Sequence, residues 1–111
     1  MSDPDNKPSE HAVILQFLYG KTDLSEMFAF EDQLRSAVEA AVAGEVDGHD
    51  IATDGSHGLF YLYGPNADTL YSAIGDTLRQ AVGIRVTSVK LRYGSVFDPD
   101  AKEVTHQFDP N

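Results

Sequence analysis

The stretch from His11 to Tyr19, HAVILQFLY, decides the fold because it is dense in β-branched and aromatic residues. In an extended chain its apolar side chains fall on both sides. One side carries Val13, Leu15, Phe17 and Tyr19, and the other carries Ala12, Ile14 and Leu18. This two-sided pattern is typical of a central strand that is covered on both faces. Residues 57–63, which contain GLFYLY, have the same character and predict a second central strand.

Two amphipathic helices are predicted around these strands. The first helix follows Asp23, which together with Glu26 three positions later resembles a capping box. Gly44 is suited to the C′ position at the other end of this helix. Its apolar stripe is Met27, Phe30, Leu34, Val38, Ala41 and Val42, and its solvent side is Glu31, Asp32, Arg35 and Glu39. The second helix begins after a cap at Asn66 and ends at Gly83. Its apolar stripe is Leu70, Ile74, Leu78 and Val82.

Two further strands complete the expected architecture. Residues 45–53 are polar and suit an edge strand, Asp54-Gly55 signals a hairpin, and residues 84–93 alternate in polarity. The element order is therefore βαββαβ, which right-handed crossovers convert into an antiparallel sheet with two helices on one face. We expect an α+β, ferredoxin-like sandwich with four strands in the order 4-1-3-2. This order puts the two doubly apolar strands in the centre.

The remaining segments flank one domain at residues 11–95. Residues 1–10 read as a disordered leader without the features of a signal peptide. In the tail at 96–111, Val104, His106 and Phe108 alternate like a short extra strand. The tail is expected to form an edge strand, to cover the open face of the sheet, or to be disordered.

Composition limits the classes of function. The chain has 111 residues, no cysteine and a formal net charge of −10, so thiolate catalysis and disulfides are excluded. The charge disfavours nucleic acid and favours a basic partner or cations, although an acidic surface also serves solubility alone. No apolar run is long enough to span a membrane, and we expect a cytoplasmic protein.

The segment 45–50, EVDGHD, is the best candidate for chemistry. If it is extended, Glu45, Asp47 and His49 project to the same side, with His57 across the hairpin, and these groups are possible ligands of a divalent ion. Their spacing matches no established motif, and a solvated edge strand explains them equally well. Neither phosphate-binding loops nor a nucleophile elbow is present. We therefore expect no catalytic residue and no cofactor.

The apolar excess on the central strands is the clearest functional clue. Two helices cover one face of a sheet, so residues on the other face need a different cover. Depending on the register, this interaction face is Ile14 and Leu18 with Phe60 and Leu62, or the corresponding odd-numbered set. The tail, a second copy of the chain or another protein is the expected cover.

Short motifs at the ends of the elements give a resemblance. Glu45-x-Asp47-Gly48-His49-Asp50, Tyr63-Gly64-Pro65 and Arg92-Tyr93-Gly94 resemble motifs of a group of small bacterial proteins of unassigned function with a ferredoxin-like βαββαβ fold. The resemblance covers residues 12–95. It implies the fold and a bacterial origin and transfers no activity.

These observations favour a non-catalytic interaction or regulatory module that uses the open sheet face as a homodimer or with another protein. An acidic immunity protein that neutralises a basic toxin or nuclease is an alternative. A small enzyme or metal-binding protein that uses the 45–57 hairpin is a further alternative.

Overall fold

The structure is a computed structural model that describes residues 10–95 and 98–108. The chain forms β1 (His11–Leu18), α1 (Ser25–Ala40), β2 (Glu45–Ile51), β3 (His57–Gly64), α2 (Ala67–Ala73), α3 (Gly75–Arg79), β4 (Arg85–Arg92) and β5 (Glu103–Gln107). Within the described ranges, no helix combines the length and apolar character needed to cross a membrane.

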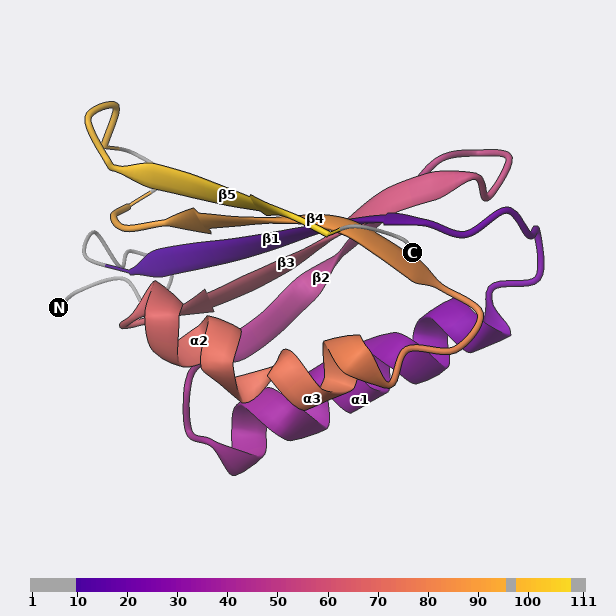
Figure 1. Cartoon of the computed structure of the whole chain (residues 1–111), viewed down its shortest axis with the longest axis horizontal. Coiled ribbons are helices and arrows are strands. Elements are labelled where there is room, and N and C mark those ends of the chain that lie inside the picture. The colour runs from indigo at the N-terminus through magenta and orange to yellow at the C-terminus, as the bar shows by residue number, and fades with distance from the viewer. Residues whose placement is uncertain (1–9, 96–97, 109–111) are drawn as a thin grey trace, which may run out of the picture.

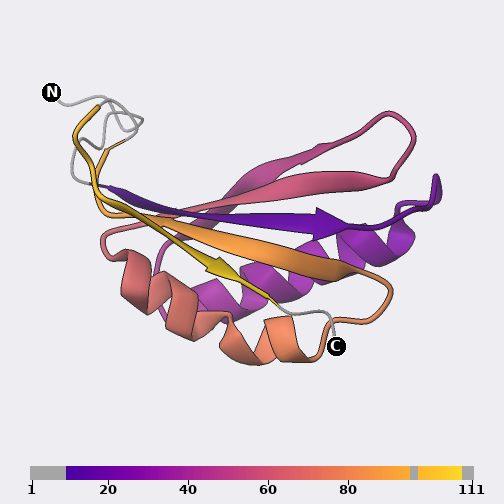
Figure 2. The same ribbon diagram turned by 45° about the horizontal axis from the view of Figure 1, so that its top comes forward.

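The architecture is an α+β sandwich of two layers. Five antiparallel strands form one sheet in the order β2-β3-β1-β4-β5, and α1, α2 and α3 lie together against one face (Figure 1). Figure 2 shows the same helices beneath the sheet from a second angle. The expected four-stranded sheet with two helices is not matched exactly, because β5 extends the sheet beyond β4 and a third helix is present.

The hydrophobic core lies between the sheet and the helices. In the antiparallel register Leu15 of β1 lies opposite Phe60 of β3, and the rings of Phe17 and Phe60 stack with centroids 4.6 Å apart. The core also contains Met27, Phe30, Leu34 and Val38 from α1 and Val89 and Leu91 from β4. The predicted apolar stripe of the first helix and the alternation of the last predicted strand are therefore confirmed over these residues.

The second predicted helix is divided into two short ones. Asn66 caps α2 as expected, because its side-chain oxygen accepts hydrogen bonds from the backbone N–H groups of Asp68 and Thr69. The helix then breaks at Ile74, and α3 begins at Gly75, a residue with low helix propensity. Val82 lies beyond α3 with 77% of its surface exposed, so its predicted place in the apolar stripe is wrong.

The ends of α1 also differ from the expected caps. Asp23 accepts a hydrogen bond from Ser25 N–H, and Glu26 pairs with Lys21, so no capping box forms. At the other end Val42 occupies the C′ position, with φ of 51°, and its N–H donates to the carbonyl of Glu39.

Gly44 has a different role from the predicted one. A β-carbon at this residue would lie 2.0 Å from the carbonyl oxygen of Tyr63, so glycine permits the close approach of the loop to β3.

The tail contributes a strand, as one of the alternatives anticipated. β5 pairs with β4 along one edge of the sheet, and Phe108 N–H donates to the carbonyl of Thr87 just beyond this pairing. Most of the predicted leader, residues 1–9, lies outside the described residues.

Candidate functional site

The helix-free face of the sheet carries the candidate site. Residues that lie directly opposite one another in an antiparallel sheet share a face, so each cross-strand row can be followed through the register. One row on this face runs from Gly48 through Tyr61, Ile14 and Lys90 to Thr105. The neighbouring row contains Asp50, Leu59, Gln16, Ser88 and Gln107.

A shallow hollow of about 360 Å³ lies over the middle of these two rows. Its residues are Ile14, Gln16, Leu59, Tyr61, Ser88, Lys90, Thr105 and Gln107. Ile14, Leu59 and Tyr61 form a half-buried apolar strip, whereas the β4 and β5 side is polar. An apolar centre with a polar surround is the general anatomy of a protein-binding surface.

Hydrogen bonds hold the side chains around this strip. The Tyr61 hydroxyl donates to Oδ2 of Asp50 at 2.7 Å, and this bond raises the pKa of Tyr61 above its ordinary value. Ser88 Oγ lies 3.1 Å from Oε1 of Gln16. On the adjoining row burial raises the pKa of Tyr63, with a smaller contribution from the charge of Asp47. The face is therefore an ordered surface with defined polar positions.

The predicted interaction residues do not lie on one face, which corrects the grouping made from the sequence. Ile14 and Leu18 are on the helix-free face, and Leu18 is 45% exposed near the end of β1. Phe60 and Leu62 are fully buried between the sheet and the helices, because the register places them opposite Leu15 and Val13.

The β3 residues that share the helix-free face with Ile14 are therefore the odd-numbered Leu59 and Tyr61. Tyrosine is a signal that could have identified this set, since a hydroxyl favours the side of a strand that reaches water. Gln16 is a similar signal on β1.

The four candidate metal ligands are not gathered into one site. The pairing of β2 with β3 shifts between Val46 and Gly48, so Asp47 is left in a bulge. Glu45 consequently lies opposite Tyr63 on the helix-free face, whereas His49 lies opposite Phe60 on the helix side. The prediction that Glu45, Asp47 and His49 share one side is wrong for this reason.

His57 lies on the helix-free face at the opposite end of β3 from Glu45. Among residues 10–95 and 98–108, no group of three or more histidine and acidic side chains is arranged to hold a metal ion.

His49 instead forms a largely buried pair with Glu31 of α1. The Nδ1 atom of His49 lies 2.8 Å from Oε2 of Glu31, whose exposed fraction is 7%. Phe28 and Phe60 approach the imidazole edge-to-face, with ring centroids at 5.7 and 6.3 Å. Glu31 was expected on the solvent side of its helix, and this interpretation is corrected because β2 covers that turn of α1.

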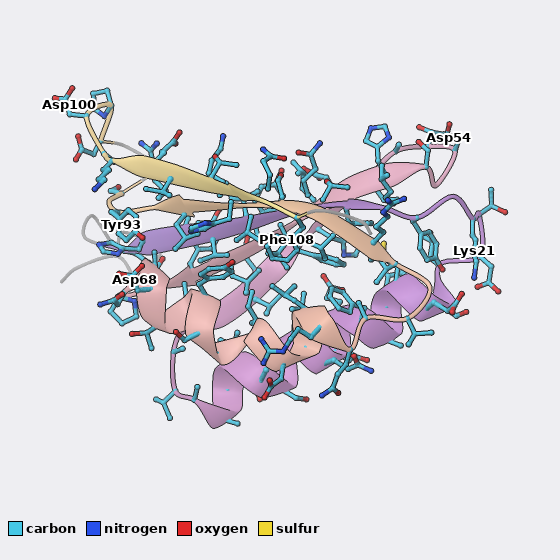
Figure 3. The ribbon with its side chains drawn as sticks, in the orientation of Figure 1. Lys21, Asp54, Asp68, Tyr93, Asp100 and Phe108 are labelled. Atoms are coloured by element: carbon cyan, nitrogen blue, oxygen red, sulfur yellow. The ribbon has the colours of Figure 1, made fainter. Side chains whose placement is uncertain are left out.

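Ser56, in the β2–β3 turn, and His57, the first residue of β3, lie within hydrogen-bond distance of each other. Ser56 Oγ lies 2.8 Å from Nδ1 of His57, while the backbone N–H of Ser56 donates to Oδ1 of Asp54. Figure 3 shows Asp54 at the tip of the β2–β3 hairpin, where it is exposed. The carboxylate of Asp54 bonds to the backbone of Ser56 rather than to the imidazole of His57, so the three residues do not form a nucleophile–base–carboxylate relay.

A second concavity of about 480 Å³ lies on the helix side, next to the end of β5. Its residues are Tyr71, Ser72, Gly75, Leu78, Arg79 and Phe108. Phe108 points into the space between the sheet and the helices (Figure 3), and His106 stacks on Tyr71 with centroids 5.1 Å apart. These contacts fix β5 against α2.

Comparison with known proteins gave no match among protein-family models, curated proteins or solved structures. The resemblance to small bacterial proteins therefore stays a prediction.

Proposed function

We propose that the protein is a non-catalytic interaction module that works as a homodimer and receives a protein partner on its helix-free sheet face. The hollow over Ile14, Leu59 and Tyr61 is the observation that carries this proposal. Its apolar strip can receive one or two apolar side chains, and the polar residues around it can fix their orientation.

The course of the tail supports the same proposal. If the tail folded across the helix-free face, the tail itself would cover that face and leave less of it for a partner. In the described ranges the tail instead forms β5, which lies beside β4 and contributes Thr105 and Gln107 to the rim of the hollow. We also interpret the fold as a ferredoxin-like sandwich with one added strand, since the first four strands follow one another as β2-β3-β1-β4.

The proposed partner is a basic protein. The chain carries a net charge of −10, which draws basic proteins toward it and repels acidic ones. At the β2 flank of the face the acidic residues Glu45, Asp47 and Asp50 are all exposed. An inhibitor that neutralises a basic toxin or nuclease is one form of this function, and the same charge favours it.

Site-specific photo-crosslinking tests the proposal. A photoreactive amino acid at Gln16, on the helix-free face, should capture a basic protein in cells of the source organism, whereas one at exposed Ser36 of α1 should not. The captured protein is then purified, and its affinity is measured for Leu59→Lys and for the control Ser36→Lys. Equal capture at both positions, or equal affinity of both variants, would contradict the proposal.

A further inference from the structure

Of the two edges of the sheet, β5 is the one suited to pairing with another chain. Figures 1 and 2 show it at the margin of the sheet, and β4 is its neighbour. The other edge, β2, carries a bulge at Asp47, a glycine and three acidic residues, which are features that discourage strand pairing. β5 has the sequence EVTHQ and is regularly paired with β4 over all five residues.

The hydrogen-bond pattern shows which backbone groups of β5 face outward. Tyr93 N–H donates to the carbonyl of Lys102, and Phe108 N–H donates to the carbonyl of Thr87. Hydrogen-bonded pairs alternate along an antiparallel ladder, so Val104 and His106 also bond to β4. The backbone N–H and C=O groups of Glu103, Thr105 and Gln107 consequently point away from the sheet.

We propose that β5 pairs antiparallel with β5 of a second copy, about a twofold axis that passes through Thr105. In this register Glu103 lies opposite Gln107 of the second copy, Val104 lies opposite His106, and Thr105 lies opposite itself. The outward-facing backbone groups of all three odd-numbered residues then meet one another, as the ladder requires.

The side chains are complementary in the same register. The carboxylate of Glu103 faces an amide rather than a second carboxylate, and threonine opposite threonine is a favourable cross-strand pair. β5 is also held in place for this contact, because its His106 stacks on Tyr71 and Arg92 binds Glu103 at 2.5 Å. The side chains of β5 are therefore suited to pairing with β5 of a second copy of the chain.

Pairing would join the two helix-free faces into one surface. Opposed residues in a sheet share a face, so both hollows would lie on the same side of a ten-stranded sheet, with Thr105 and Gln107 of each copy at the junction. The inference rests on the self-association in the proposed function and identifies the surface that produces it. It does not depend on the identity of the basic partner.

Sedimentation equilibrium up to about 1 mM protein measures the self-association. Thr105→Pro removes an outward N–H that β4 does not use, so it should abolish the dimer, whereas Thr105→Val should retain it. Thr105→Lys places two like charges together and is the second variant should the proline variant fail to fold. Higher salt should tighten the dimer by about threefold or more, because it screens the repulsion between two acidic chains.

Disulfide trapping tests the register, since the chain has no cysteine of its own. In Thr105→Cys the two α-carbons would lie about 5.5 Å apart, within reach of a disulfide. The control is Lys90→Cys, on the same face but one strand inward, where the pair would be about 14 Å apart. Rapid cross-linking of the first variant alone supports the pairing.

Three results would overturn the pairing: a monomer at all concentrations, a Thr105→Pro variant that dimerises like the wild type, or equal cross-linking of both cysteine variants. Salt separates this inference from the open-face proposal. Binding of a basic partner weakens as salt rises, while the β5 dimer strengthens.

Discussion

Oε2 of Glu31 lies 2.8 Å from Nδ1 of His49, and this contact ties α1 to the edge strand β2. Both side chains are largely enclosed, so each depends on the other for its hydrogen bond. His49→Leu should lower the free energy of unfolding by about 2 kcal/mol or more, because it leaves a buried carboxylate without this partner. Denaturant titration of the purified variant measures the change.

The double variant Glu31→Leu/His49→Leu is the control for this prediction. It removes the carboxylate together with its partner, so it should recover much of the stability lost in His49→Leu. Additive losses from the two substitutions would contradict the proposed pairing.

The conformation of Val42 gives a second prediction. This residue combines φ of 51° with 88% exposure, although a β-branched side chain disfavours that region of the backbone map. Val42→Gly should therefore raise the free energy of unfolding by about 1 kcal/mol. Thermal and denaturant unfolding measure it, and Ala41→Gly, at a residue with φ of −86°, should destabilise instead.

Two glycines of the β2–β3 hairpin test the register of the sheet. A β-carbon at Gly58 would lie 2.3 Å from the carbonyl oxygen of Asp50 and 2.7 Å from the Phe17 ring, whereas one at Gly48 would meet nothing within 4 Å. Gly58→Ala should cost about 2 kcal/mol or more. Gly48→Ala should change stability by less than about 0.5 kcal/mol. Similar losses in both variants would argue against this packing.

Tyr61 should give the protein a specific sensitivity to alkaline pH. The hydrogen bond to Asp50 holds the pKa of Tyr61 above its unfolded value, so its contribution is complete below about pH 10 and is lost as pH rises through the folded pKa. Near neutral pH, Tyr61→Phe should reduce stability by about 0.5 to 1 kcal/mol.

The gap between wild type and Tyr61→Phe should close at high pH. Parallel unfolding curves between about pH 8 and 11 measure it, with tyrosinate absorbance as the titration signal. A gap that stays constant over this range would show that the hydrogen bond does not control the ionisation of Tyr61.

The sequence was sufficient to predict the main elements and the central position of the two apolar strands. Apolar residues alternate along the strand that contains Leu15 and recur every three or four residues along the helix that contains Leu34. Such local patterns are sufficient to predict a strand and a helix. The sheet differs from the expected four-stranded one because β5 extends it beyond β4. The break between α2 and α3 lies at Ile74, just before a glycine of low helix propensity, and the repeat of apolar residues alone does not report it.

The candidate site was harder to predict because it depends on register. A single bulge at Asp47 moved His49 to the helix side, where Glu31 of a distant helix became its partner. On β3 the choice between Phe60 and Tyr61 as the outward residue required the pairing with β1. Neither relationship is visible in residue spacing alone.

The affinity of the protein captured at Gln16 for the Leu59→Lys variant shows whether the helix-free face is the surface that binds the partner. Leu59 lies in the middle of the helix-free face and lines its hollow. We predict that Leu59→Lys weakens binding by about tenfold or more, while Ser36→Lys on α1 leaves it unchanged. Undiminished binding by Leu59→Lys would show that the helix-free face is not the interaction surface, and a loss in Ser36→Lys alone would place that surface on the helices.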